Sequence, residues 1–418
     1  MGEFFGDAAA MTATVTQTLT LENENKVIHL RPYHGRKLYP RQDVTIGTHT
    51  MGASLPQYLK IKVHQEVLRR RYDEIIVMGA YNRYFTSSVP FDGEKRDKPF
   101  NWERPTARPS DDGKILYIEC FPGYDHIEHY AEIIASYLHI LEAPGPNQRT
   151  DLTRSDRVAF IPSSCSDTLS ALQLCTNLLS FPGDGVDTVI LGMVWHLSNL
   201  TSWPSTQFQG TGPWQWIIHQ YPRSNRRVAF LGFRPAFWGC ISGEVIHLLS
   251  RQFASIKEFI YIGKLGTLTP GIRPNHFLAT GSQSLLNNRI ISWDNCLSNS
   301  VSKIAKDSVV VGSHVTLGSV LHETKEWHAS HRRDGIDFVD PEIGNMAQAA
   351  VRSGRRYGYL HLITDNLGQK YDEDLSNERT ESVLKGRARL YRVIRDVMEF
   401  HLTCTDADGR VVGEEDTS

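Results

Sequence analysis

The sequence predicts an α/β fold built on a largely parallel sheet. Along most of the chain, near-continuous apolar segments alternate with segments whose apolar residues recur at helical spacing. Strands that are apolar on both faces belong to sheets that helices cover on both sides. The 418 residues are 40% hydrophobic and 22% charged, which is enough for a substantial core and for two or three domains.

The first part of the chain, residues 26–150, is expected to form an N-terminal α/β extension. Residues 1–25 are polar and rich in threonine, which is typical of a flexible arm. The elements expected in the extension are, in order, a strand (72–81), a charged and proline-rich surface loop (91–114), a strand (115–121) and a helix (127–143). The polar break at 142–156 is the predicted domain boundary.

A second domain is expected over residues 151–402, followed by an acidic tail at 403–418. The expected strands are 157–162, 187–193, 226–233, 259–263, 308–320 and 357–364, and the expected helices are 166–181, 241–253, 342–354 and 379–400. Ser166 or Asp167 is placed to cap the first of these helices. In such sheets, ligands bind beyond the carboxyl ends of the strands.

Charge and cysteine content narrow the class of function. The chain has 45 basic and 47 acidic residues, so its net charge of −2 argues against binding to nucleic acid or a membrane surface through bulk charge. No apolar run reaches the roughly 18 residues that a membrane span requires. The six cysteines form no C-x-x-C pair, which fits reduced thiols in a cytoplasmic protein. We therefore expect a cytoplasmic protein that binds neither nucleic acid nor a membrane surface through bulk charge.

The segment "FIYIGKLGTLTPGIRPNHFLATGS" (259–282) is the first candidate for a ligand site. An apolar strand runs into Gly263, and the following G-K-L-G-T-L is expected to be a turn. Gly263 and Gly266 would allow backbone N–H groups to approach a ligand closely. An isolated G-x-x-G is more often only a tight turn, and this one matches neither the Walker pattern nor the G-x-G-x-x-G fingerprint. Its meaning therefore depends on the segments that follow.

Four segments in this order resemble the purine nucleoside phosphorylase and uridine phosphorylase superfamily, which includes the methylthioadenosine/S-adenosylhomocysteine-type nucleosidases. The segments are "IGKLGTLTPGIRPNHFLATGS" (262–282), "VVVGSHVTLGSVLHET" (309–324), "VDPEIGNMAQAA" (339–350) and "GYLHLITDN" (358–366). The resemblance covers about residues 187–400 and leaves residues 1–150 unexplained. It implies a three-layer αβα nucleoside-phosphorylase-type domain, cleavage of N-glycosidic bonds and a homo-oligomeric assembly.

The resemblance also implies roles for two carboxylates. Asp365 matches the family's base-protonating aspartate, and Glu342 matches the glutamate that binds the ribose hydroxyls. Breaking an N-ribosidic bond places positive charge on the sugar and negative charge on the base. A protonated acid can therefore act on the base, and a carboxylate can stabilise the sugar. Each carboxylate also has a purely structural interpretation. Asp365 could cap a helix or turn after its strand, and Glu342 could be an acid in the first turn of a helix, where the helix dipole favours negative charge. The other side chains expected at the substrate are Gly263, Lys264, Gly266, Arg234, Asp340, Leu321, Thr364 and Asn366.

Several positions depart from the family pattern. Tyr261 stands where phosphorylases place a phosphate-binding arginine, and Lys264 replaces the usual serine or threonine. Pro341 replaces a methionine that lies against the ribose, and Leu321 stands near the position of a base-stacking aromatic residue. These changes favour water over phosphate as the nucleophile. Lys264 could be an anion anchor together with Arg234, a catalytic amine, or a solvent-facing turn residue.

The leading interpretation is hydrolysis of the N-glycosidic bond of a nucleoside or nucleotide-like substrate, without a cofactor or a metal ion. One alternative is an enzyme of the same fold that acts on another small molecule and is centred on Lys264. Another is a binding or storage protein without turnover. His126 and His129 have a spacing that a metal pair allows, but they are expected to be surface histidines of a helix.

Overall fold

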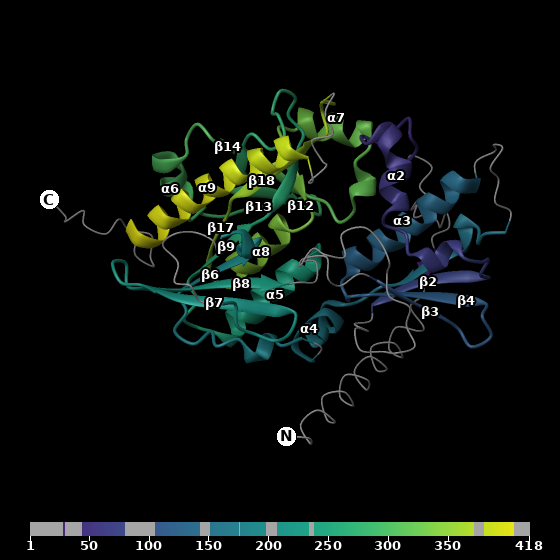
Figure 1. The fold of residues 1–418 in the computed structure, drawn as a ribbon, viewed down its shortest axis with the longest axis horizontal. Coiled ribbons are helices and arrows are strands. Elements are labelled where there is room, and N and C mark those ends of the chain that lie inside the picture. The colour runs from purple at the N-terminus through teal and green to yellow at the C-terminus, as the bar shows by residue number, and fades with distance from the viewer. Residues whose placement is uncertain are drawn as a thin grey trace, which may run out of the picture. The chain divides into compact units, whose positions relative to one another are not determined.

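The chain forms two compact α/β units in the computed structural model, so the predicted class is confirmed (Figure 1). The structure describes residues 28–29, 44–79, 105–142, 151–174, 176–197, 207–233, 238–371 and 380–404. The first unit comprises Met1–Thr176, Arg234–Ile241 and Gly318–Trp327, and the second comprises Asn177–Phe233, Ser242–Leu317 and His328–Ser418. The expected arm lies outside the described residues, as does the expected acidic tail beyond residue 404.

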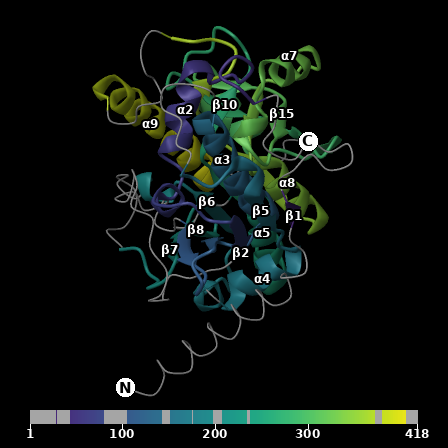
Figure 2. The same ribbon diagram turned by 90° about the vertical axis from the view of Figure 1, so that its right-hand side faces the viewer.

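The first unit contains a five-stranded sheet with the order β1-β5-β2-β4-β3. Its strands are β1 (Ile28–His29), β2 (Glu74–Gly79), β3 (Thr106–Pro109), β4 (Ile115–Cys120) and β5 (Val158–Ile161), and its helices are α2 (Leu55–Lys60), α3 (Tyr124–Glu142) and α4 (Cys165–Leu174). Strands β5, β2 and β4 are parallel, whereas β1 and β3 run antiparallel at the edges. The long helix α3 packs on β5 and β2 (Figure 2).

The pairing of β5 with β2 places residues 158–161 in the first unit, although we expected them to open the second domain. The compact units therefore divide the chain at Thr176 instead of residue 150, because the polar break at 142–156 only precedes one more strand of the first sheet. A functional division at residue 150 stays a prediction.

Helix α4 begins one residue before the caps that we expected. Ser164 caps it: the Ser164 hydroxyl accepts from the N–H of Asp167 at 3.2 Å, and Asp167 accepts from the N–H of Ser164 at 2.7 Å. The helix ends at Leu174 instead of residue 181. Asn177, in the second unit, instead hydrogen-bonds the backbone of Trp214 at 2.9 Å through both its amide nitrogen and its amide oxygen.

The second unit contains two sheets, of which the first has the order β17-β9-β6-β8-β7. Its strands are β6 (Thr188–Gly192), β7 (Trp214–Tyr221), β8 (Arg226–Phe233), β9 (Glu258–Ile262) and β17 (Arg356–Tyr359). All pairs are parallel except β7 with β8, and β7 is a strand that we did not predict. Trp214 is fully buried in β7.

Helices cover this parallel sheet on both faces, as the resemblance implied. The helices of the second unit are α5 (Cys240–Gln252), which begins in the first unit, α6 (Ser298–Ile304), α7 (Lys325–Arg333), which also spans both units, α8 (Ile343–Arg352) and α9 (Glu381–Cys404). Ile190, Ile260 and Ile262 share one core cluster with apolar residues of α6 and α9. Since successive strand residues face opposite sides, their neighbours point to the other face, where α8 contacts β9 and β17.

The second sheet of this unit is mixed, with the order β13-β12-β15-β16-β10-β18-β11-β14. Its strands are β10 (Lys264–Thr267), β11 (Leu278–Thr280), β12 (Gln283–Leu286), β13 (Arg289–Ser292), β14 (Val309–Val311), β15 (His314–Thr316), β16 (Phe338–Asp340) and β18 (His361–Asn366). Our expectation of a largely parallel arrangement is wrong here, because short connections reverse the chain. Asn287 and Asn288, both with positive φ, form the two-residue turn between β12 and β13.

The predicted turn after Gly263 is instead strand β10. The chain leaves the five-stranded sheet after β9 and enters the eight-stranded sheet at Lys264, so Gly263 marks a change of sheet. The segment that pairs with β9 and β10 changes sheet in the same way: β17 lies in the five-stranded sheet, β18 lies in the eight-stranded sheet, and Leu360 separates them. The strand that we expected over 308–320 is likewise divided into β14 and β15. The apolar pattern of the sequence predicts these strands, but it does not show that consecutive strands belong to two different sheets.

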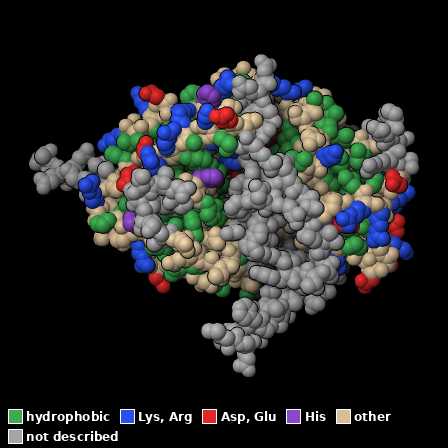
Figure 3. Space-filling model, in the orientation of Figure 1, with side chains coloured by type: hydrophobic (Ala, Val, Ile, Leu, Met, Phe, Trp, Pro, Cys, Tyr) green, Lys and Arg blue, Asp and Glu red, His purple; other side chains and the backbone are tan. Residues whose placement is uncertain are grey.

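Minor elements complete the described chain. The 3-10 helices are η2 (Gly52–Ser54), η3 (Gln65–Leu68), η5 (Ser155–Arg157), η6 (Leu178–Ser180), η7 (Val194–His196) and η8 (Val320–His322). None of the described helices is long and apolar enough to cross a membrane. Acidic and basic side chains are interspersed over the described residues on the face drawn in Figure 3.

Candidate functional site

Asp365 lies near the carboxyl end of β18, beside Gly266 of β10. A Cβ atom on Gly266 would lie 2.6 Å from Asp365 Oδ2, so the close approach of this carboxylate requires a glycine. The hydroxyl of Thr364 donates to Asp365 Oδ1 at 2.9 Å. Asp365 itself remains exposed. The two strands therefore fix a carboxyl group that a ligand can reach.

Two cationic side chains act on this carboxyl group, Lys264 from β10 and Arg387 from α9. The surrounding protein displaces water and raises the pKa of Asp365, while Thr364, Arg387 and Lys264 oppose that rise. Because the side chain stays open on one side, solvent limits the effect of burial. The result is a carboxyl group whose pKa is raised by burial, a rise that two nearby positive charges oppose.

Arg387 is a residue of this site that we did not predict. It is only 8% exposed, and its Nε donates to Asn275 Oδ1 at 2.8 Å. Asn275 has a positive φ of 61° and donates its N–H to the carbonyl of Ile363 at 2.7 Å, which ties the arginine to β18. A Cβ on Gly386 would lie 2.8 Å from the carbonyl oxygen of Asn275, so a larger residue would disturb this clamp.

Glu342 and Asp340 meet at the start of α8. Asp340 Oδ1 accepts from the N–H groups of Glu342 at 3.0 Å and Ile343 at 2.9 Å, so Asp340 caps the helix. Both acids are buried. Burial, and then the nearby Asp340 carboxylate, hold the pKa of Glu342 well above its usual range. Burial also acts on Asp340, but His314, whose Nε2 lies 3.0 Å from Oδ1, outweighs burial and lowers the pKa of that carboxyl.

Gly263 and Tyr261 lie beside the same acids. A Cβ on Gly263 would lie 2.8 Å from His361 Nε2, so the glycine leaves room for that ring. The ring of Tyr261 packs edge-on against His361 with centroids 4.5 Å apart. Burial, and then Glu342 and Asp340, raise the pKa of Tyr261 far above its usual value, so its phenol stays neutral. The position that the resemblance aligns with a phosphate-binding arginine therefore carries a neutral, buried side chain.

Three other predicted substrate residues lie elsewhere or have other partners. Leu321 is fully buried in the core cluster of the first unit. Asn366 donates to the carbonyls of Thr269 and Ile272 at 2.9 and 2.8 Å and accepts from the N–H of Gly368 at 2.9 Å, so it pins a loop. Arg234 lies outside the described residues. The structure thus brings Lys264, Gly266, Thr364 and Asp365 together, and separately gathers Gly263, Asp340 and Glu342.

A buried ion-pair network lies at the amino end of β9, the end of the strand away from Gly263 and Lys264. Glu258 Oε1 accepts from Arg226 at 2.7 Å, and its Oε2 accepts from Arg356 at 2.7 Å. His401 Nε2 lies 3.0 Å from Oε1. Among the described residues, Glu258, Cys296 and His401 are the three acidic, thiol or imidazole groups close enough together to hold a metal ion. Because both carboxylate oxygens already bind arginines, we interpret this group as structural.

His126 and His129 are buried, so the expectation of surface histidines is wrong. Their face of α3 packs inside the first unit, where the ring of His129 stacks on Trp238 with centroids 4.4 Å apart. His129 Nδ1 lies 2.9 Å from the hydroxyl of Ser319, and His126 Nδ1 lies 3.2 Å from the carbonyl of Phe121. These contacts account for both rings as parts of the core.

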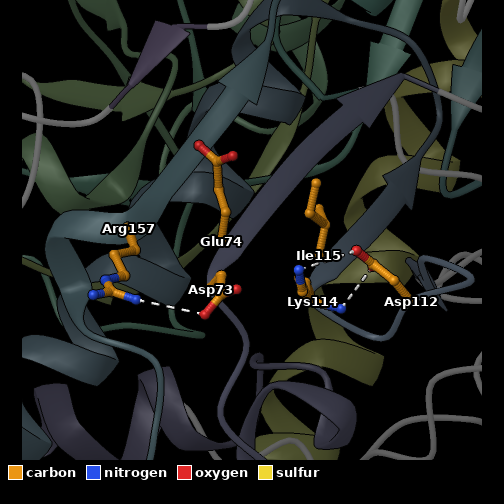
Figure 4. A pocket seen from close by; sticks show the side chains of 6 residues that line it. All are labelled: Asp73, Glu74, Asp112, Lys114, Ile115 and Arg157. Carbon is orange, nitrogen blue, oxygen red and sulfur yellow. Dashed lines mark hydrogen bonds and ion pairs between the residues drawn. The ribbon is translucent and has the colours of Figure 1, made fainter.

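A cavity of about 430 Å³ in the first unit contains none of the predicted site residues (Figure 4). It lies by the amino ends of β2 and β4, whereas ligands of open α/β sheets bind at the carboxyl ends. Its charged groups lie near one another, with Arg157 3.9 Å from Asp73 and Lys114 3.9 Å from Asp112. The lining residues are Asp73, Glu74, Asp112, Lys114, Ile115 and Arg157. We assign no function to this cavity.

Comparisons with solved structures give several partial likenesses. The 5'-methylthioadenosine/S-adenosyl homocysteine nucleosidase of Campylobacter jejuni is 14% identical, with a TM-score of 0.41 over 51% of this chain and 99% of that one. The uridine phosphorylase of Vibrio fischeri is 9% identical, with a TM-score of 0.42 over 51% and 90%. The futalosine hydrolase of Helicobacter pylori is 13% identical, with a TM-score of 0.40 over 51% and 97%. These TM-scores are too low to support a conclusion.

Family assignment rests instead on the sequence. No curated protein sequence matches this chain. The family model described as the phosphorylase superfamily matches residues 242–399, which include β10, β16, β18 and most of α9. The match contains Lys264, Glu342, Asp365 and Arg387. Over residues 242–399, the chain therefore matches the phosphorylase superfamily, in agreement with the resemblance that the order of its motifs predicted.

Proposed function

We propose that this protein cleaves the N-glycosidic bond of a nucleoside or nucleotide-like substrate, with water rather than phosphate as the nucleophile. The observation that carries the proposal is the Asp365 carboxyl group, held at the carboxyl end of β18 with Lys264 and Arg387 acting on it. This group belongs to the segment that matches the phosphorylase superfamily. A cytoplasmic location and a homo-oligomeric assembly are parts of the same proposal.

The chemistry follows from the charges that develop as the bond breaks. Protonated Asp365 donates its proton to a ring nitrogen of the leaving base, which then departs as a neutral molecule. Lys264 and Arg387 stabilise the negative charge that builds on the base before that proton arrives. Glu342 holds the sugar hydroxyls on the other side, where positive charge builds. Water adds to the anomeric carbon, and the proton that it loses restores protonated Asp365 for the next cycle.

The preference for water rests on Tyr261 and Lys264. Phosphate binding by a phosphorylase requires cationic and hydroxyl donors around the anomeric carbon. Tyr261 is buried against His361 and has replaced the cation, and Lys264 has replaced the hydroxyl. Lys264 acts electrostatically on Asp365, which supports a role on the base side of the substrate.

The proposal is tested with a panel of nucleosides, nucleotides and free bases. We expect at least one nucleoside or nucleotide to release its base with the purified full chain, as measured by chromatography. If no compound is cleaved, the proposed function is wrong. Binding in a thermal-shift assay without cleavage would then favour a binding protein, and turnover of another kind of small molecule would favour a repurposed enzyme centred on Lys264.

Replacement of Lys264 by methionine tests its role. If it anchors an anion, K264M should raise KM for an anionic substrate by about 10-fold or more, because a hydrogen bond to a charged group contributes about 1.5–3 kcal/mol. KM for a neutral analogue should change less. The exposed Lys370 gives the control K370M. If Lys264 is instead a covalent amine, borohydride should trap a carbonyl substrate on it, whereas unchanged kinetics and no adduct would leave it without a role in the reaction.

A further inference from the structure

Around Glu342 and Asp340, the second unit buries a cluster of titratable groups. His314 from β15 and His361 from β18 face Asp340, with Nε2 atoms 3.0 Å from its Oδ1 and 3.7 Å from its Oδ2. Tyrosines of β9 and β17 act electrostatically with the two acids. Every side chain of the cluster is less than a tenth exposed. The tyrosines are Tyr261, Tyr357 and Tyr359.

The hydrogen bonds of this cluster are incomplete. Asp340 Oδ1 already accepts from two backbone N–H groups, whereas no donor within the described residues reaches the buried Oδ2. Both ring nitrogens of the buried His361 also lack a hydrogen-bond partner within the described chain. A buried carboxylate oxygen without a donor is costly, so a donor at Oδ2 would stabilise the cluster.

Charge balance indicates which group supplies that donor. Among the described residues, no lysine or arginine acts on Glu342, and the charged group that does act on it is Asp340. Burial and the neighbouring Asp340 carboxylate disfavour the ionised form of Glu342, whereas His314 favours the ionised form of Asp340. Burial holds the pKa of His361 to about 4, so that ring is neutral near pH 7 and does not supply the missing charge. Protonation of one acid resolves both the charge repulsion and the missing donor.

We propose that Asp340 and Glu342 share one proton at neutral pH, with Glu342 as the protonated partner and His314 as a positioning residue for Asp340. Asp340 keeps its negative charge because two backbone N–H groups and His314 face its Oδ1. The hydroxyl of Ser284 lies 2.9 Å from His314 Nδ1 and can donate to it, which leaves Nε2–H directed at Asp340. Protonated Glu342 then donates to Asp340 Oδ2.

The shared proton gives the sugar side of the proposed reaction an adjustable charge, and this part of the inference rests on the proposed function. Glu342 can accept a sugar hydroxyl on the oxygen that does not donate to Asp340. As positive charge builds on the sugar, the O–H bond of Glu342 breaks while an O–H bond forms on Asp340. The negative charge thereby moves toward the sugar without a proton entering or leaving the pair. The substrate class is therefore a glycoside whose sugar carries a hydroxyl group.

Infrared difference spectroscopy of the full chain tests the shared proton without a substrate. We expect the C=O band of a buried, protonated carboxyl group at pH 7 in the wild type. Glu342→Gln should lose this band, whereas any band of the solvent-exposed Asp365 should remain. Asp340→Asn keeps an oxygen that can cap α8, so the protein should fold, and the midpoint at which the band titrates should fall by at least about one pH unit. His314→Gln should shift that midpoint, which a merely structural histidine would not do.

Asp337→Asn is the matched control, because Asp337 lies beside β16 but pairs with Arg332 at 2.9 Å. This variant should keep the band. Absence of the band in folded wild-type protein at pH 7 would overturn the inference, and so would its loss in Asp365→Asn with retention in Glu342→Gln. A wild type that has the band but cleaves no nucleoside would contradict only the proposed function, whereas cleavage without the band would contradict only the shared proton.

Discussion

Asp365→Asn is expected to lower kcat by about 100-fold or more. Asparagine keeps the size of the side chain and can still accept from the Thr364 hydroxyl, but it cannot deliver a proton to the leaving base. Loss of a positioned general acid usually lowers the rate by roughly 100-fold to 10,000-fold. The measurement is kcat for base release by purified wild type and variant on the best substrate of the panel.

Two comparisons separate this chemical effect from a structural one. Asp307 is exposed on the loop before β14, so Asp307→Asn should leave kcat unchanged. The melting temperature of Asp365→Asn should stay close to that of the wild type, because the exposed carboxyl adds little to packing. A variant that melts far lower yet turns over normally would show that Asp365 is a structural group and not the acid.

Glu258→Gln should produce the largest loss of stability. The change removes the charge that balances Arg226, whose side chain is completely buried, and leaves that cation unpaired in the core. Breaking a buried ion pair by removing one partner costs about 3–5 kcal/mol. Urea unfolding should therefore show a lower free energy of unfolding for the second unit. Glu381→Gln, which disrupts an exposed pair with Lys385, should have almost no effect.

The same carboxylate gives a pH dependence of known sign. Burial alone would raise the pKa of Glu258, but His401, Arg226 and Arg356 together hold it far below its usual value of 4.5. The folded state therefore binds the proton of Glu258 more weakly than the unfolded state does. Its contribution to stability is complete above about pH 4.5 and is lost as the pH falls toward the folded pKa. The stability difference between wild type and Glu258→Gln should shrink on acidification, and a constant difference would contradict this account.

The sequence predicted the family because the relevant motifs are local. Gly266 and Asp365 each lie in a motif of a few consecutive residues, and the order of the four motifs predicted the resemblance without knowledge that β10 pairs with β18. Strand β10, which begins at Lys264, was not predicted, because the apolar pattern of a segment is the same whether it stays in one sheet or passes into a second one. Pairing partners decide where a strand changes sheet, and these are distant in sequence.

Arg387 could have been predicted from the sequence. In the last helix it occupies the apolar stripe that also contains Val383, Leu390, Ile394 and Val397, positions at which a charged residue is unexpected. The stripe indicates that Arg387 is buried but does not identify its hydrogen-bond partner Asn275, which lies 112 residues away in the chain. The proposed shared proton of Asp340 and Glu342 could not be predicted from the sequence, because it depends on which histidine side chains face the two acids.

The identity of the released sugar, with and without phosphate, tests the central claim most directly. The wild type is incubated with the best substrate in water enriched in oxygen-18, and the sugar product is analysed by mass spectrometry. The account predicts free sugar that carries one oxygen-18 atom, at a rate that added phosphate does not change. Strict dependence on phosphate, with a sugar 1-phosphate as the product, would contradict it.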